Sequence, residues 1–432
     1  MQSKYLKVNV SALMLASVAL LTTAAQAQTD APYSEPILSI EHVVQTVVRF
    51  NPSLQAAQRG RQIAAASITS AGAIQNPRIE SLMGTHRPTQ NGVNSGNIGG
   101  WGVSQFIENP SIRRARIEAA TFGGDAAQQL VVADTNELIA QTRLKAYEHL
   151  LRRAEALAAV DALKLLEDIR GRVKIRVDSG EAARYELIKA DAEVINARQK
   201  SQTALLLAEQ SILSINRLAA GQLPARWRMA ESLTDPIEPI SIEKIQQTAR
   251  QNNPEIKALE AEVQRREAKL KEARSGKWPG LEVRYGRLRE PDARQGVLTA
   301  SLQIPLFDQK IGPTREAVLE VERARILLEG RQADLEQQIL LAWKNLDIAK
   351  VRIQALSTGS IREAEAALRV AEAAYRFGER GILDVLDAQR LLRSVNADLL
   401  DARFQLQTAS VALNTLAGLY SQSALSQSTT VQ

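Results

Sequence analysis

The sequence predicts a mainly helical fold with a small β part, built on long helical hairpins. One reason is a heptad pattern of apolar and small residues that recurs in both halves of the chain. A second is that very long stretches with few helix breakers follow short segments of alternating polarity. A third is the constant spacing of matching motifs, which indicates that one structural unit occurs twice, over residues 28–220 and 241–420.

The stretch from Tyr375 to Gln389 is the clearest local signal, and it predicts a tight turn between two helices. Gly378 and Gly381 are expected to supply the backbone freedom that such a reversal needs. Asp384 and Asp387 place negative charge in the first turn of the next helix, where the helix dipole favours it.

The helix after this turn carries a heptad pattern typical of a coiled-coil seam, with an apolar row and a second row rich in small residues. The two rows are Val385, Leu392, Leu399, Leu406 and Leu413, and Ala388, Val395, Ala402, Ala409 and Leu416. A similar turn lies at Gly180, 198 positions before Gly378. The rows that follow it are Leu187, Val194, Ser201, Ala208 and Ile215, and Ala190, Ala197, Ala204, Ser211 and Leu218.

The run Gly-x-x-Gly-Ile-Leu-Asp-Val-Leu-Asp-Ala at 378–388, with its weaker copy at 180–190, resembles the TolC-like outer-membrane factor family. These proteins are the exit ducts of bacterial efflux pumps and type I secretion systems. The resemblance implies long coiled-coil hairpins that form an α-barrel, and four strands per chain that contribute to a trimeric transmembrane β-barrel. It also implies a place in the outer membrane of a Gram-negative bacterium, with the hairpins extending into the periplasm.

Three further segments are read from composition. Residues 1–27 have lysines, an apolar run and a small-x-small site, and are interpreted as a secretory signal peptide. Residues 221–240 contain three prolines and are expected to link the two repeats. The polar stretch 421–432 is interpreted as a disordered tail.

Prolines bound the first helix of each half, expected at Pro52 to about Ala73 and at Pro254 to about Ser275. Alternating segments then predict strand pairs at about 78–107 and 281–305. Four strands cannot close a barrel, so the chain must associate, and the resemblance supplies the number three.

The longest helices are expected at Ser111 to about Val177 and at Thr314 to about Phe377. At ~1.5 Å per residue, a helix of this length spans on the order of 100 Å. Such hairpins, with tips near 180 and 378, could cross the periplasm.

Charge and cysteine content exclude several classes of protein. The net charge is +6, but lysine and arginine alternate with acidic residues along helical segments, and aromatics make up only 4%. This pattern is typical of solvated helix faces rather than of a nucleic-acid surface. The chain has no cysteine, so it can be neither a lipoprotein nor a holder of thiolate-bound metal.

No catalytic site is indicated. The histidines at 42, 86 and 149 are far apart in sequence, and each is interpreted as an ordinary surface residue rather than a metal ligand. Neither a catalytic triad nor a phosphate-binding loop is recognisable. We therefore expect no enzyme activity, no bound metal and no cofactor.

Asp384 and Asp387 have two interpretations. On local sequence they are favourable charges at a helix start. The resemblance instead implies that they line the narrow periplasmic entrance, where symmetry makes a ring of carboxylates. The first repeat carries Glu186 and Lys189 at the matching positions, so it lacks a second acidic pair.

The resemblance also implies a latch that closes the entrance and a docking surface. Tyr375 and Arg380 would reach from the second hairpin to Glu186 and Tyr185 on the first, with Tyr185 in place of a smaller hydroxyl residue. The tip glycines are expected to contact a periplasmic adaptor protein, and they are Gly180, Gly378 and Gly381.

The segments 103–116 and 304–312 resemble the CzcC-like branch of the family, which serves heavy-metal pumps. The expected function is therefore an outer-membrane exit duct for heavy-metal cations. Its expected partners are two further copies of the chain, an adaptor, an inner-membrane transporter of the resistance-nodulation-division class, and outer-membrane lipid. A duct for drug efflux or type I protein secretion is one alternative, and a secreted coiled-coil scaffold without a pore is another.

Overall fold

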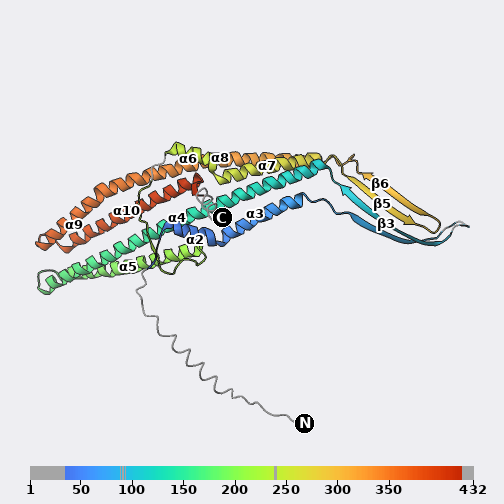
Figure 1. Cartoon of the computed structure of the whole chain (residues 1–432). Coiled ribbons are helices and arrows are strands. Elements are labelled where there is room, and N and C mark those ends of the chain that lie inside the picture. Colours follow the sequence, from blue (N-terminus) through green and yellow to red (C-terminus); the bar gives the residue numbers. More distant parts are fainter. Residues whose placement is uncertain (1–34, 88, 90–91, 93, 238–240, 421–432) are drawn as a thin grey trace, which may run out of the picture.

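The computed structural model describes residues 35–87, 89, 92, 94–237 and 241–420. The signal peptide predicted at 1–27 and the tail predicted at 421–432 lie outside these residues. The described chain is elongated, with a β-sheet at one end and two helical hairpin tips at the other (Figure 1).

The same order of elements occurs in both halves of the chain, and each half begins with a short helix that precedes the first helix expected from the sequence. The first half comprises α2 (Ile40–Phe50), α3 (Pro52–Ala71), β2 (Arg78–His86), β3 (Gly96–Ile107), α4 (Pro110–Asp178) and α5 (Arg184–Leu218). The second comprises α6 (Ile242–Asn252), α7 (Pro254–Ser275), β5 (Leu281–Arg289), β6 (Arg294–Leu302), α8 (Ile311–Ala355), η1 (Leu356–Ser360), α9 (Ile361–Arg376) and α10 (Ile382–Leu416). No helix among the described residues has the length and hydropathy of a membrane span.

The two longest helical segments differ in regularity. α4 runs for 69 residues without interruption. The segment expected as one helix from 314 to 377 is instead divided by η1, a five-residue π-helical turn. Ser357 and Thr358 in this turn both direct their hydroxyls at the Gln354 carbonyl, and such competition with the backbone pattern accompanies irregular helix turns.

An asparagine organises the start of α3, and another does the same for α7. The Asn51 side chain accepts from the amides of Ser53 and Leu54, which caps α3, and its Nδ2 donates to the Leu218 carbonyl over 3.0 Å. Asn253 makes the matching bonds at the start of α7, including one of 3.0 Å to the Leu416 carbonyl. Each asparagine therefore ties a helix start to the end of a hairpin.

The helices form a wall rather than a rounded core. α4 lies in the middle and packs against α3 and α5 on one side and against α7 and α10 on the other. α8 packs against α7 and α10, and α9 packs against α10. α3 and α5 thus form one edge of the wall, and α8 and α9 form the other (Figure 1).

The heptad seams predicted from the sequence are confirmed. None of the twenty seam positions in α5 and α10 is exposed. This includes the two serines, Ser201 and Ser211, which are buried like the apolar residues around them. Alanines on these rows, such as Ala190, Ala197 and Ala402, are among the most deeply buried residues. Small side chains let the helices approach closely, as the pattern indicates.

The four long strands form one antiparallel sheet in the order β2-β3-β5-β6. Cross-strand partners share a face, so Ile79, Val103, Tyr285 and Leu298 form one apolar row, and all four are exposed. The opposite face carries Glu80 and Arg284, which form an ion pair, together with Thr299. One face of the sheet therefore carries an apolar row across all four strands and the other carries this ion pair, and within the described chain the edges at β2 and β6 are unpaired.

Residues 221–237 do more than join the two repeats. Among them, β4 (Arg228–Met229) pairs in parallel with β1 (Ile37–Leu38). Trp227 is only 2% exposed and belongs to a hydrophobic cluster that also contains Val43, Val47 and Ile215. Besides joining the two repeats, residues 221–237 therefore help to fill the core where α2, α4 and α5 meet.

Candidate functional site

The two hairpin tips lie side by side at the end of the wall opposite the sheet (Figure 1). A shared hydrophobic cluster joins them, with Leu166, Ile169, Val173 and Val194 from the first hairpin and Ala371, Ile382, Val385 and Leu386 from the second. The two turns that lie 198 residues apart in the sequence are thus at the same end of two hairpins that pack against each other.

Both tips use the same turn geometry. Gly180 has a φ of 80° and Gly378 a φ of 75°, which is the left-handed region that favours glycine. After α4 the amide of Glu181 donates to the Arg176 carbonyl over 2.8 Å, and after α9 the amide of Glu379 donates to the Ala374 carbonyl over 2.9 Å. These are Schellman turns, so the prediction of tight turns at both positions is confirmed.

Gly381 plays a different part from the one expected. It is the N-cap of α10, with a φ of −79° and an extended backbone that any residue can adopt. A Cβ atom at this position would lie 4.0 Å from Glu186 Oε1, which is an ordinary contact. The expectation that Gly381 supplies backbone freedom to the turn is therefore wrong.

Each expected entrance carboxylate has an arginine partner in the same chain. Asp384 accepts from Arg380 Nη1 over 3.1 Å, and Asp387 accepts from Arg390 Nη1 over 2.6 Å. Both pairs lie on the exposed surface of α10 and its preceding turn. The assignment of these aspartates to an entrance ring stays a prediction, since a single chain has no symmetry axis.

The four expected latch residues lie near one another but form none of the expected bonds. Tyr375 Oη and Glu186 Oε2 are both buried, and neither has a hydrogen-bond partner among the described residues. Burial raises the pKa of the Tyr375 hydroxyl, and the nearby Glu186 carboxylate adds to the rise. Arg380 bonds to Asp384 instead, while Tyr185 is exposed, with Lys189 Nζ over its ring.

Other side chains, which the sequence analysis did not single out, connect the hairpins. Arg176 of α4 donates to the Tyr375 carbonyl over 3.1 Å, and its guanidinium lies 4.8 Å from the centre of the Tyr375 ring. Arg390 of α10 donates to Glu193 of α5 over 2.6 Å, and Arg393 lies 3.8 Å from the same carboxylate. The heptad pattern places Glu193 and Arg390 beside their seams, but it does not show that they contact each other.

One interpretation of the histidines needs correction. His42 is exposed, as expected, and the side chain of His86 lies outside the described residues. His149, in contrast, is only 3% exposed: its Nδ1 lies 2.7 Å from Ser211 Oγ and its ring is 5.8 Å from Trp227. Burial lowers the pKa of His149, and nearby Arg153 lowers it further.

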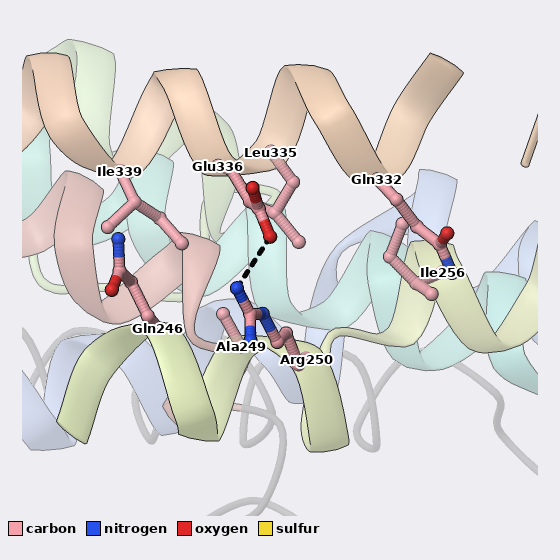
Figure 2. A pocket seen from close by; sticks show the side chains of 8 residues that line it. All are labelled: Gln246, Ala249, Arg250, Ile256, Gln332, Leu335, Glu336 and Ile339. Atoms are coloured by element: carbon pink, nitrogen blue, oxygen red, sulfur yellow. Dashed lines mark hydrogen bonds and ion pairs between the residues drawn. The ribbon is translucent and has the colours of Figure 1, made fainter. Parts of the chain in front are cut away.

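Metal-ligating side chains do not cluster in the part of the chain that the structure describes. Within residues 35–87, 89, 92, 94–237 and 241–420, no group of three or more histidine, aspartate or glutamate side chains is placed to hold a metal ion. A groove of about 260 Å³ lies between α6, α7 and α8 (Figure 2). Its polar lining centres on an ion pair of 2.8 Å between Arg250 and Glu336, with Gln246 and Gln332 beside it.

Comparison with known proteins agrees with this geometry. Residues 245–419 match the family model described as "Outer membrane efflux protein". The chain is 24% identical over 384 residues to the cobalt-zinc-cadmium resistance protein CzcC of Cupriavidus metallidurans, covering 88% of this chain and 90% of that protein.

Solved structures share the fold. The outer membrane channel CmeC of Campylobacter jejuni matches with a TM-score of 0.77 at 14% identity, over 99% of this chain and 97% of that one. The outer membrane channel MtrE of Neisseria gonorrhoeae, in its open state, matches with a TM-score of 0.73 at 18% identity, over 91% and 94% of the two chains.

Proposed function

We propose that the chain is a member of the outer membrane efflux protein family and that it is the outer-membrane exit duct of a tripartite efflux system for heavy-metal cations, because residues 245–419 match the family model and the chain resembles CzcC. One observation supports the assignment as a duct. The described chain is a wall of helices continued by a sheet, and the two edges of both the wall and the sheet have no further element packed against them. A wall of this kind is one segment of a tube.

The two edges are suited to pairing with further copies. Apolar side chains are exposed along α5 at one edge, namely Ile188, Ile195, Leu206 and Leu213. They are also exposed along α8 at the other edge, namely Ile326, Leu341, Ile348 and Val351. Contact between copies would remove these surfaces from water, and the pairing of β6 with β2 of the next copy would satisfy their backbone groups.

A homotrimer would bring roughly twelve strands together, which lies in the range of outer-membrane barrels. The apolar row with Ile79 and Leu298 would then face outer-membrane lipid, and the face with Glu80 and Arg284 would line an aqueous lumen. The exposed apolar row that crosses all four strands on one face, and the ion pair on the other, support this orientation.

The helical part supports a role as a conduit through the periplasm. The 69 residues of α4 extend over about 100 Å at ~1.5 Å per residue. At the far end Gly180, Gly378 and Gly381 lie at the tips, where we propose contact with a periplasmic adaptor and, through it, with a transporter of the resistance-nodulation-division class. A duct of this kind is not an enzyme and needs no cofactor.

The tip would be the periplasmic entrance of the duct. We assign Asp384 and Asp387 to its lining, and Tyr375, Arg380, Glu186 and Tyr185 to a latch between the hairpins. The buried and unpaired Tyr375 hydroxyl and Glu186 oxygen support a latch whose bond forms when the trimer assembles.

The heavy-metal assignment is supported by the likeness to CzcC over 88% of the chain. A strain that lacks this protein should grow worse on cobalt, zinc or cadmium, and the wild-type gene should restore growth. If the strain is sensitive only to drugs, the assignment of heavy-metal cations as the substrate is wrong, but the assignment of the protein as an exit duct still stands. In mass photometry of the detergent-solubilised protein, a trimer is expected, and a stable monomer would contradict the duct itself.

A further inference from the structure

Three arginines lie on the face of the sheet that carries the apolar row, and we call them the arginine cluster: Arg287 and Arg289 of β5 and Arg294 of β6. Arg289 and Arg294 are cross-strand partners, and Arg287 precedes Arg289 by two residues, so all three share the face of Tyr285 and Leu298. All three are exposed. On a lipid-facing surface the cost of an arginine depends on depth, and it is small only near the membrane boundary.

The arginine cluster lies at the end of the strands that is farthest from the helices (Figure 1). On this face β5 begins with Leu281 and ends with Arg289. At ~3.4 Å per residue and a tilt of roughly 40°, the stretch between them rises by roughly 20 Å, close to the ~25 Å apolar band of an outer-membrane barrel. The cluster would therefore stand at the upper boundary of the membrane, where acyl chains end and headgroups begin.

An aromatic pair lies beside the cluster and marks the same boundary. Trp101 is the cross-strand partner of Arg287, and its ring centre lies 6.0 Å from that of Tyr285. The two side chains are 49% and 42% exposed. Tryptophan and tyrosine are enriched at the level of lipid headgroups, because one end of each ring is apolar and the other is polar.

No carboxylate of the described residues neutralises the arginine cluster. Among the described strand residues this face carries no acidic side chain, because Glu80 and Glu282 both belong to the opposite face. In the adjoining turn Asp292 accepts from Asn94 Nδ2 over 2.7 Å, and Glu290 forms no ion pair with the cluster. The positive charge of the cluster is thus uncompensated within the described chain.

A second copy of the chain would not supply the missing anion at this face of the sheet. In the proposed trimer β6 pairs with β2 of the next copy, whose residues on this face are Ile79, Ser81, Met83 and Thr85. None of them is acidic. The counter-charge is therefore expected from outside the protein, at the level of the headgroups.

We propose that the arginine cluster is a docking site for a phosphorylated lipid of the outer leaflet, with guanidinium groups bound to its phosphates and the apolar row against its acyl chains. The inference rests on the proposed function, because this face meets lipid only in an outer-membrane barrel whose hairpins extend into the periplasm. Arginine suits the task, since its planar guanidinium binds phosphate through two parallel hydrogen bonds. Because Arg294 lies on the edge strand β6, the bound lipid would lie across the boundary between two copies.

The test measures how tightly the full-length protein in detergent binds bis-phosphorylated lipid A, followed by native mass spectrometry. Loss of one headgroup-level arginine should weaken binding about fivefold, so Arg287→Gln should show this change and the triple change of the cluster to glutamine about a hundredfold. The control is Arg78→Gln, which removes an exposed strand arginine from the opposite face and should bind as the wild type does. The triple change to lysine keeps the charge without the planar fork and should fall between the wild type and the triple glutamine variant.

Each variant is first shown to be a trimer by mass photometry. Wild-type affinity of the triple glutamine variant would overturn the inference, and so would an equal loss in Arg78→Gln. Equally tight binding of dephosphorylated lipid A by the wild type would exclude the phosphates as the recognised groups. Complete displacement of the lipid by an excess of inorganic phosphate would show a site for free anions instead of a lipid site.

Failure of the proposed function would be seen separately. A wild-type chain that is monomeric, or that fractionates with soluble periplasmic protein, would contradict the duct before any lipid is added. A wild-type trimer in the outer membrane whose arginine cluster makes no difference to lipid binding would leave the duct in place and overturn the lipid site alone.

Discussion

Replacement of Asn51 by alanine should destabilise the junction of α2, α3 and α5 more than an ordinary capping mutation does. The side chain caps α3 through the amides of Ser53 and Leu54, and it also donates to the Leu218 carbonyl, while being only 7% exposed. Loss of the cap costs about 1 kcal/mol. Loss of the third bond, which leaves a carbonyl without its donor, costs about 1 kcal/mol more.

The free energy of unfolding should therefore fall by about 2 kcal/mol. Ser39→Ala provides the control, because Ser39 caps α2 through the His42 amide alone and makes no long-range bond. Asn51→Asp separates the two contributions, since a carboxylate still accepts from the two amides but cannot donate to Leu218. The order of stability should be wild type, then Asn51→Asp, then Asn51→Ala.

The measurement is urea unfolding of the detergent-solubilised protein, followed by far-ultraviolet circular dichroism. Asn253→Ala, which removes the matching bonds of α7 and the one to the Leu416 carbonyl, should cost as much as Asn51→Ala. If Asn51→Ala costs no more than Ser39→Ala, the bond to α5 contributes nothing and the reasoning fails.

Three further predictions concern the entrance and the core. Gly378→Ala should destabilise its tip by about 1 kcal/mol because of the positive φ, with faster proteolysis there, while Gly381→Ala should not. The double change Asp384→Asn with Asp387→Asn should weaken cation selectivity and block by multivalent cations in planar bilayers, and unchanged selectivity would place the entrance ring elsewhere. The free energy of unfolding should fall as the pH drops below about 6.5. His149 then binds a proton in the unfolded chain but not in the folded chain, where burial lowers its pKa. His149→Gln should flatten this slope in urea unfolding, and an equal slope in both proteins would exclude His149 as its cause.

Local patterns in the sequence are sufficient to predict turns, buried helix faces and helix starts, because each of these features favours one kind of residue for a known physical reason. Gly180 and Gly378 occur where the backbone adopts a positive φ, and no other residue does so at comparable cost. The heptad rows in α5 and α10 predict burial because a helix presents every third and fourth residue to the same neighbour. Pro52 and Pro254 mark helix starts because proline lacks the amide that a first turn leaves unpaired.

Local sequence patterns are not sufficient where the burial of a residue depends on which distant segment packs against it. The segment 221–240 has the prolines of a linker, yet Trp227 enters the core and covers His149, which thereby becomes buried. No local pattern distinguishes a tryptophan in a loop from one that returns to the core. The π-helical turn at Leu356–Ser360 is equally hidden, because serine, threonine and glycine also occur in regular helices.

Contacts between the hairpins are the hardest to predict, because they depend on register and side-chain reach together. The 198-residue spacing places Glu186 and Asp384 at matching heights, which suggested a latch through Tyr375 and Arg380. An arginine side chain reaches more than one helical turn, however, and the nearest carboxylate along its own helix competes for it. Arg380 accordingly pairs with Asp384, four residues on, whereas Arg390 can bond to Asp387 and to Glu193 at once. Bridging therefore requires an arginine whose local carboxylate occupies only one side of its guanidinium, and of Arg380 and Arg390 only Arg390 meets this condition.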